Sequence, residues 1–282
     1  MSVRLKARAR AILGIEPWPD LAVRHRLFRA REYRDLRALA RPFDTPKPTK
    51  PVIERHHQAS YVVARWFVDG GVRSAFHAGY ASGRYVFYLS RIGIVAGGTD
   101  LPPDETGWNQ VPPLALDEET RRRLLPVDFF KLTPAHVASV WGSAALPIGV
   151  LFSEATFETL LPWREEHVSV EKYKTMDAGV RRELMHRSFP EKLAELQGCF
   201  RNMVFIEPEP TAGGAGEIFE ACARRLPEFS YSVWSFRPPL DRLFRLSPRH
   251  PTRQTVYAYV RDHRLLEALR AYAEPRRRTS RW

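Results

Sequence analysis

One stretch of the chain combines the residue types that hold a nucleoside. Ser74 to Pro103 reads "SAFHAGYASGRYVFYLSRIGIVAGGTDLPP": an apolar run, a turn with Gly79 and Gly83, a helical pattern, and a second apolar run that ends at Asp100. Glycines let a backbone approach a ligand, and the start of the following helix offers free N–H groups. A carboxylate at the end of the next strand can accept hydrogen bonds from both hydroxyls of a ribose. The stretch therefore predicts a binding turn at the edge of a sheet.

The rest of the chain supplies alternating elements that would position this turn. A helix is expected over residues 53–71, where Gly70 and Gly71 end it. Strands are expected at 73–78, 93–99, 126–130, 147–153, 202–210, 231–236 and 254–262, and helices at 84–92, 117–125, 134–142 and 216–226. Alternation of this kind is typical of parallel βαβ units. We therefore predict an α/β fold with a doubly wound, mostly parallel seven-stranded sheet.

Two further segments flank or interrupt this domain. Residues 1–50 are predicted to form a basic helical arm whose end is rich in proline, and residues 51–282 the main domain. Residues 157–200 are predicted to be mostly helical, with interruptions near Pro162 and Pro190, and to insert as a cap on the ligand-binding side. Aromatic and basic cap residues either bind a sugar or another hydroxylated ring or pack the cap onto the sheet; they are Trp163, Arg164 and Tyr173.

The charge of the chain is concentrated near its N-terminus. The net charge is +12, and residues 1–60 hold 14 Lys and Arg against 6 Asp and Glu. Such an arm attracts nucleic acid, an anionic membrane surface or a phosphorylated ligand, or it is a solvated extension, or its helical patterns pack on the domain. No apolar stretch is long enough to span a bilayer. We expect a cytoplasmic protein that can lie at the periphery of a membrane.

The cysteines and the adjacent histidines do not indicate a disulfide framework or a metal site. Cys199 and Cys222 are two isolated thiols in a chain of 282 residues, which favours reduced core residues and a reducing compartment. His56 and His57 are neighbours in a predicted helix, so their rings point in different directions and do not chelate one ion. No Cys/His cluster has the spacing of a zinc site.

The turn, the acid and the order of elements together resemble the class I S-adenosylmethionine-dependent methyltransferases. "HAGYASG" stands in the place of their Gly-rich first motif and "GGTDLPP" at the end of their second strand, within a resemblance that covers residues 56–262. The resemblance implies S-adenosylmethionine as cofactor and one antiparallel strand among the last two. It also implies that Gly79 and Gly83 lie under the methionine portion and ribose, and that Asp100, followed by Leu101, holds the ribose. By the same correspondence Asp128 lies near the adenine amino group and Phe129 beside the ring.

Two positions depart from the pattern of that family. Both are still expected at the cofactor: His77 stands where an acid usually helps to hold the ammonium group of the cofactor, and Ala81 replaces the middle glycine. A neutral histidine accepts a hydrogen bond but provides no charge pairing. A nicotinamide-binding Rossmann protein also shows a Gly-rich turn followed by an acid, but a full G-x-G-x-x-G is missing here. The departures leave open a non-catalytic scaffold built on a degenerate methyltransferase domain.

The expected reaction is methyl transfer to a hydroxyl of a small molecule such as a sugar or a glycolipid precursor. The protein then has to align the acceptor and supply a base. Candidate bases are Glu154, Glu158, His136, His167 and Glu207, of which Glu154 and His167 lead because both are expected at the rim where the acceptor enters. An RNA methyltransferase is the alternative that the basic arm suggests, although the sequence shows no RNA-binding motif.

Overall fold

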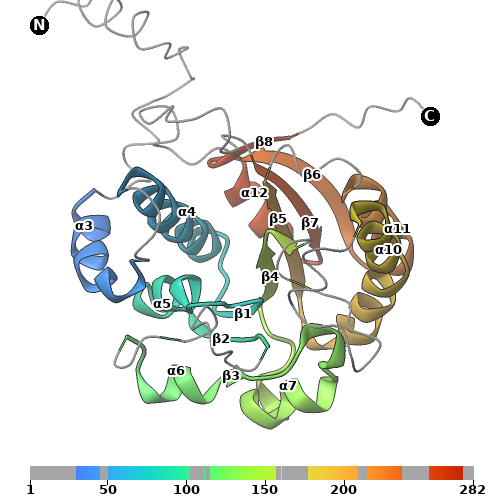
Figure 1. Cartoon of the computed structure of the whole chain (residues 1–282), viewed down its shortest axis with the longest axis horizontal. Coiled ribbons are helices and arrows are strands. Elements are labelled where there is room, and N and C mark those ends of the chain that lie inside the picture. Colours follow the sequence, from blue (N-terminus) through green and yellow to red (C-terminus); the bar gives the residue numbers. More distant parts are fainter. Residues whose placement is uncertain are drawn as a thin grey trace, which may run out of the picture.

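The computed structural model describes residues 30–44, 50–101, 111, 115–156, 160, 177–208, 215–236 and 254–275. Its centre is one sheet flanked by helices on both faces (Figure 1). The strands are β1 (Ser74–Ala78), β2 (Val95–Thr99), β3 (Leu124–Leu125), β4 (Val150–Glu154), β5 (Asn202–Pro208), β6 (Ser230–Phe236), β7 (Gln254–Val260) and β8 (Ala273–Pro275). Their order across the sheet is β3-β2-β1-β4-β5-β7-β6-β8.

Strands β1 to β5 are parallel to one another, so their carboxyl ends meet at one edge of the sheet. Strand β7 pairs antiparallel with β5 and with β6, and β8 adds an antiparallel pairing to β6. The predicted doubly wound, mostly parallel sheet with its antiparallel strand is therefore confirmed. The short strand β8 at the edge extends the predicted seven strands.

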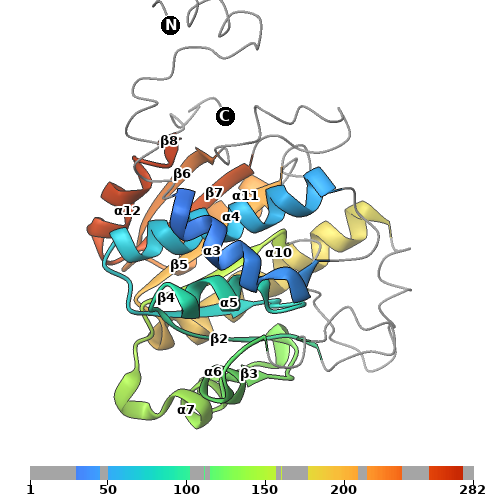
Figure 2. The ribbon, with the colours of Figure 1, turned by 90° about the vertical axis from the view of Figure 1, so that its left-hand side faces the viewer.

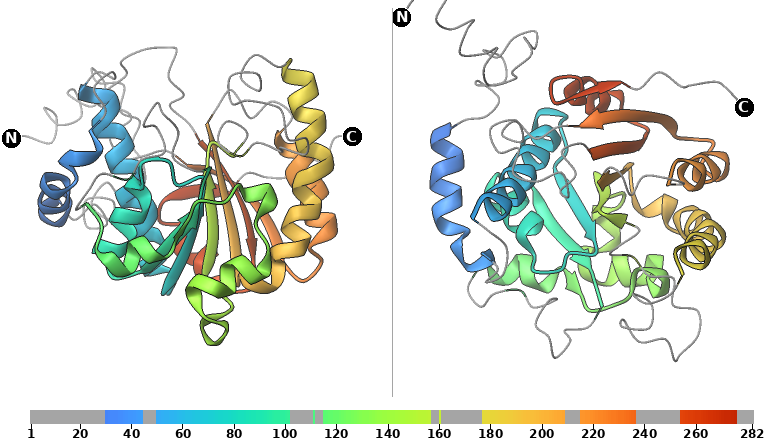
Figure 3. Two further views of the ribbon diagram at one scale, coloured as in Figure 1. Left: turned by 60° about the horizontal axis from the view of Figure 1, so that its bottom comes forward. Right: turned by 45° about the horizontal axis from the view of Figure 1, so that its top comes forward.

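Two layers of helices cover the faces of the sheet, as the edge-on view in Figure 3 shows. One layer holds α3 (Ala30–Leu39), η1 (Arg41–Phe43), α4 (Lys50–Asp69) and α5 (Arg84–Arg91); the other holds α10 (Ala178–Leu196), η4 (Gln197–Cys199) and α11 (Ala215–Arg225). The remaining helices are α6 (Glu118–Arg122), η2 (Phe129–Lys131), α7 (Pro134–Trp141), η3 (Ser143–Ala145) and α12 (His263–Leu269).

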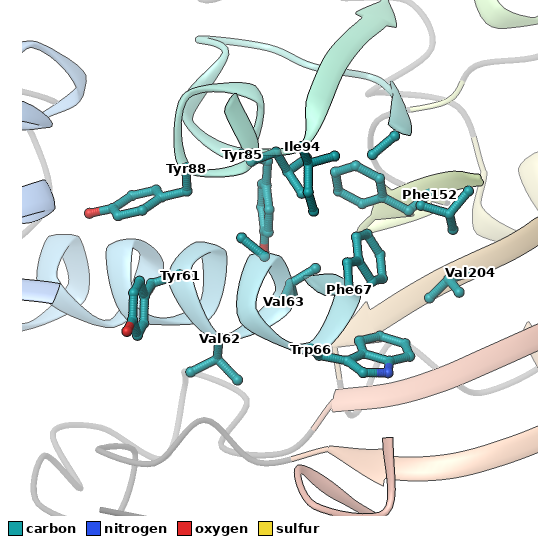
Figure 4. Close-up of a cluster of buried hydrophobic side chains, with 14 of the residues drawn as sticks. Tyr61, Val62, Val63, Trp66, Phe67, Tyr85, Tyr88, Ile94, Phe152 and Val204 are labelled. Atoms are coloured by element: carbon teal, nitrogen blue, oxygen red, sulfur yellow. The ribbon is translucent and has the colours of Figure 1, made fainter. Parts of the chain in front are cut away.

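The two faces of the sheet bury separate aromatic cores because side chains alternate along each strand. Phe152 of β4 packs against Phe67 of α4, with ring centroids 5.4 Å apart, in the core that Figure 4 shows. Trp66 completes this core and donates its indole N–H to the carbonyl of Leu265, at 2.9 Å, which fixes α12 to α4. The opposite face buries a cluster around Phe189 of α10.

The described part of the predicted basic arm packs on the domain. Helix α3 lies beside α4 (Figure 2), and the Tyr33 hydroxyl donates to the carboxylate of Glu54. Arg37 pairs with Glu54 at 3.0 Å, and the buried His57 ring lies 3.0 Å from Asp44. Burial, followed by the nearby Arg37 charge, lowers the pKa of His57 to about 3, so the ring is neutral and donates its Nε2–H to the carboxylate of Asp44. Residues 1–29 lie outside the described part of the chain.

Local predictions around the third strand were wrong by a few residues. Residues 126–130 were predicted as a strand, but the strand is Leu124–Leu125, and Asp128 caps the short helix η2 instead. The helix expected over 117–125 is reduced to Glu118–Arg122. An aspartate that accepts a backbone N–H two residues later favours a cap over an extended strand.

The predicted insertion contains α10, a regular helix in the layer that covers one face of the sheet. Helix α10 continues through Pro190, where an interruption was predicted. Proline removes one helical hydrogen bond, but the buried Phe189 and Leu193 on either side hold the helix on the sheet. The proposed cap residues Trp163, Arg164 and Tyr173 lie outside the described residues.

Three smaller findings complete the description. Helix α12 and strand β8 follow β7, where no further element was expected. Cys199 and Cys222 are buried free thiols, as predicted. None of the described helices is both long and apolar enough to cross a bilayer.

Candidate functional site

The turn between β1 and α5 has the backbone shape of a glycine-rich loop. Gly79, Ala81 and Gly83 all have positive φ angles, of 75°, 46° and 80°. The left-handed conformation costs a residue with a Cβ about 1–2 kcal/mol, so Ala81 occupies a position that favours glycine. Backbone bonds hold the turn: the N–H of Gly79 donates to the carbonyl of Thr99 at 2.8 Å, and that of Gly83 to the carbonyl of Tyr80 at 2.7 Å.

Asp100, at the end of β2, fixes this turn from the neighbouring strand. Its carboxylate accepts hydrogen bonds from the N–H of Ala81 and from the N–H of Leu101, the latter at 2.7 Å. The side chain of Asp100 is buried. Burial of the nearby Tyr80, followed by the charge of Asp100, raises the pKa of Tyr80 to about 12. Each carboxylate oxygen has two lone pairs. Asp100 can therefore hold the turn and still accept hydrogen bonds from a ligand.

Asp128 provides a second carboxylate at the same edge. It accepts the N–H of Phe130 at 2.6 Å and caps η2. Burial raises its pKa to about 6, although the N–H groups of Phe130 and Lys131 act in the opposite direction; the charge of Asp100 adds to the increase. Asp128 is therefore mostly ionised at pH 7, and it is held in that state against a desolvation cost.

The two carboxylates line one small pocket at this edge of the sheet. Its lining consists of Gly79, Thr99, Asp100, Leu101, Asp128, Phe129 and Leu160. The lining residues therefore bring the turn after β1, the end of β2 and the cap of η2 to one place.

Five of the eight predicted cofactor residues line this pocket, and Thr99 and Leu160 are additional lining residues. Thr99 could have been found from the sequence, because it is the last residue of a strand and directly precedes the acid. Leu160 had no such signal, because it follows β4 and reaches the pocket only through the tertiary structure. Ala81 and Gly83 shape the turn, and Ala81 also binds Asp100 through its backbone.

His77 lies in the core and is not among the residues that line the pocket. Its ring stacks on Phe152, with centroids 4.3 Å apart, and meets the ring of Tyr85 edge-on at 5.2 Å. Burial, followed by the charge of Arg84, lowers the pKa of His77 to about 3, so the imidazole is neutral. The ring is therefore part of the packing between β1, β4 and α5.

A second polar cluster lies at the carboxyl end of β4. The Glu154 carboxylate accepts the side-chain N–H of Gln254 at 3.1 Å, and its other oxygen lies 3.9 Å from the guanidinium of Arg84. Arg84 donates through Nε to the hydroxyl of Ser60 at 3.0 Å, and its Nη2 lies 3.5 Å from Nδ1 of His56. The cluster joins α4, α5, β4 and β7. The role of Glu154 as a base stays a prediction.

The other candidate bases have different surroundings. His136 is exposed and takes part in the cap of α7, where its Nδ1 accepts the N–H of Thr133 at 3.2 Å. Glu207 is buried and accepts the N–H of Thr156 at 2.7 Å. His167 and Glu158 lie outside the described residues.

The adjacent histidines face different partners. Nδ1 of His57 lies 3.1 Å from the hydroxyl of Tyr88, whereas His56 faces Arg84. Within the described ranges, no group of three or more His, Cys, Asp and Glu residues is placed to hold a metal ion.

No protein-family model and no curated protein matches the chain. Several solved structures are similar in general arrangement. The magnesium protoporphyrin IX methyltransferase from Synechocystis PCC 6803, with bound SAM, is 11% identical, with a TM-score of 0.43 over 86% of this chain and 100% of that chain. The methyltransferase domain of METTL16 is 12% identical, with a TM-score of 0.46 over 82% and 96%. The plantazolicin methyltransferase BpumL is 10% identical, with a TM-score of 0.45 over 92% and 100%.

At TM-scores below 0.5, these likenesses provide no residue-level correspondence. The class of fold follows from the sheet itself. Its order β3-β2-β1-β4-β5-β7-β6, with β7 antiparallel, is that of the Rossmann-like methyltransferase fold.

Proposed function

We propose that the chain binds S-adenosylmethionine at the carboxyl edge of β1, β2 and β3 and transfers its methyl group. One observation carries this proposal: a turn with three left-handed residues and two buried carboxylates from neighbouring loops converge on a single pocket. In open α/β sheets, ligands bind outside the carboxyl ends of the strands. When bound, the cofactor supplies a methyl group on a sulfonium, which an acceptor nucleophile displaces.

The residues of the pocket fit the nucleoside portion of this cofactor. Asp100 keeps acceptor capacity for the ribose hydroxyls, and Asp128 is an ionised acceptor for the adenine amino group. Phe129 and Leu160 are buried and give the pocket an apolar wall for a planar base. Ala81 adopts the left-handed conformation that glycine favours at the middle of such a turn.

The finer part of the proposal is the acceptor. We propose a hydroxyl of a small molecule, a sugar or a glycolipid precursor in particular, with His167 or Glu154 as base. A general base contributes about 10²- to 10⁴-fold to such a reaction. We also propose that the protein is cytoplasmic or lies at a membrane surface, and that the basic N-terminal arm binds an anionic membrane surface or nucleic acid.

Calorimetry tests the cofactor. S-adenosylmethionine and S-adenosylhomocysteine should both bind, and NADH should not. Binding of NADH alone would reject the proposal, and the failure of all three ligands to bind would indicate a scaffold.

Radiolabelled cofactor tests the acceptor. The purified chain is incubated with sugars, phenols and RNA. Label in a sugar or phenol supports the small-molecule acceptor, whereas label only in RNA would favour the RNA methyltransferase.

A further inference from the structure

Charges of opposite sign meet at the carboxyl end of β4, outside the nucleoside pocket. Arg84 and Glu154 lie 3.9 Å apart, and each side chain is 18% exposed. That separation is longer than the 2.7–2.9 Å of a charge-assisted hydrogen bond. The two groups are therefore close enough to neutralise each other and far enough apart for each to bind a further group.

The surroundings of the pair hold each charge in a defined position. Ser60 fixes Nε of Arg84 at 3.0 Å, and Gln254 donates to Oε1 of Glu154 at 3.1 Å. A guanidinium has five N–H donors, and a carboxylate has about four acceptor positions. Arg84 therefore keeps donors beyond these contacts. Glu154 also lies near the buried hydroxyl of Tyr85, whose pKa is raised by burial first and then by the charge of Glu154.

Gln254 supplies an independent sign of a ligand. Its side-chain oxygen is buried and has no hydrogen-bond partner among the described residues. A buried acceptor without a donor is costly, and native structures contain few of them. An ammonium group carries three donors and can satisfy both Gln254 and Glu154.

A cluster of this kind selects for a zwitterion. An anion alone would meet Glu154, and a cation alone would meet Arg84. An α-amino acid head group presents a carboxylate to the arginine and an ammonium to the glutamate.

The cluster and the nucleoside pocket lie at the same edge of the sheet. Strand β1, with its turn, is between β2, which ends at Asp100, and β4, which ends at Glu154. Neighbouring strands are about 4.8 Å apart, so the two strand ends are roughly 10 Å apart. A nucleoside joined to an amino acid through a short chain spans such a distance.

We propose that Arg84, Glu154 and Gln254 bind the amino-acid head group of the cofactor, with Glu154 and Gln254 on its ammonium and Arg84 on its carboxylate. This inference rests on the proposed function. It gives Glu154 a binding role in place of the predicted role as base, and it leaves His167 as the candidate base. Glu154, which is two residues beyond the β1-paired Phe152, then provides the carboxylate that His77 cannot provide.

Two ligands separate the head group from the nucleoside. S-adenosylhomocysteine carries both parts, whereas 5′-methylthioadenosine lacks the amino-acid portion. Calorimetry with the full chain compares the wild type with Glu154→Gln and with Glu118→Gln, an exposed control that pairs with Arg122 at the surface. Glu154→Gln should weaken the binding of S-adenosylhomocysteine by about 10- to 100-fold and change the affinity for methylthioadenosine by less than about twofold. The control should change neither.

The outcomes are distinct. Binding of methylthioadenosine by Glu154→Gln shows that the variant is folded, so a selective loss of S-adenosylhomocysteine supports the inference. An equal loss of affinity for both ligands, or no loss for either, would overturn the inference. No loss of affinity combined with slow turnover would support Glu154 as the base. Wild-type protein that binds both ligands equally would overturn the inference and leave the nucleoside site standing. Wild-type protein that binds neither would overturn the proposed function as well.

Discussion

Replacing Asp128 with Asn should stabilise the protein at neutral pH. Burial raises the pKa of this carboxyl from 3.8 to about 6. A raised pKa of an acid means that the folded state binds the proton more tightly than the unfolded state, so stability falls as pH rises from about 4 to 6 and stays low above that range. At pH 7 and above, the charged side chain carries its full desolvation cost.

The magnitude follows from the shift. About two pKa units, at about 1.4 kcal/mol each, set an upper limit of about 3 kcal/mol. Asn keeps an acceptor for the N–H of Phe130 but loses the charge in that hydrogen bond. The expected net gain is about 1–2 kcal/mol, or roughly 2–8 °C in Tm. The gain should shrink below pH 6 and vanish near pH 4.

Thermal melts between pH 4 and 8 measure this effect, and Asp117→Asn is a matched control. Asp117 also caps a helix, but the N–H of Thr120 lowers its pKa. Replacing Asp117 with Asn should therefore destabilise the protein at neutral pH. The difference in Tm from the wild type should disappear as pH falls through the lowered pKa of Asp117. An Asp128→Asn variant that is no more stable than wild type at pH 8, or whose gain persists at pH 4, would refute the reasoning. The same variant should bind adenine nucleosides more weakly, because it has lost the anionic acceptor.

Three further predictions concern the turn and the arm. Asp100→Asn should weaken the binding of S-adenosylhomocysteine about 10- to 100-fold in calorimetry. The single oxygen of an amide cannot accept from both Ala81 and Leu101 and also from the ribose hydroxyls, so unchanged affinity would show that Asp100 does not bind the ligand. Ala81→Gly should change the free energy of unfolding in urea by less than about 1 kcal/mol, because relief of the left-handed strain offsets the added chain entropy, and cofactor affinity should hold or increase; a marked loss of both would show that the methyl is needed. Deleting residues 1–29 should keep the Tm while abolishing salt-sensitive cosedimentation with anionic vesicles or RNA, and a full chain that ignores both at low salt would leave no role for a tether.

The turn between β1 and α5 was predictable because its information is local. Glycines at 79 and 83, a helical crossover and Asp100 all fall within a single βα unit, where residue type and spacing decide backbone shape and direction. The apolar runs likewise predicted the central strands, since buried parallel strands are apolar on both faces. The antiparallel strand among the last two was also predicted, through the resemblance to a known family.

Asp128 lies beside Asp100 at the edge of the sheet, but in a short helix cap and not in the predicted strand. Its run "PVDFF" has the composition of a strand, but the aspartate caps a short helix because its carboxylate meets the N–H of Phe130. Both conformations bring the side chain to the edge of the sheet. Hydrophobic composition does not distinguish them, because the choice depends on one hydrogen bond.

Other features depend on contacts between distant parts of the chain. Ser60, Arg84, Glu154 and Gln254 come from four elements and meet only because the sheet places β1, β4, β5 and β7 in that order. The burial of His77 between Phe152 and Tyr85, and the packing of α3 on α4, arise in the same way. Periodicity specifies which face of an element is apolar, but the partner of that face is selected by the packing of the whole core.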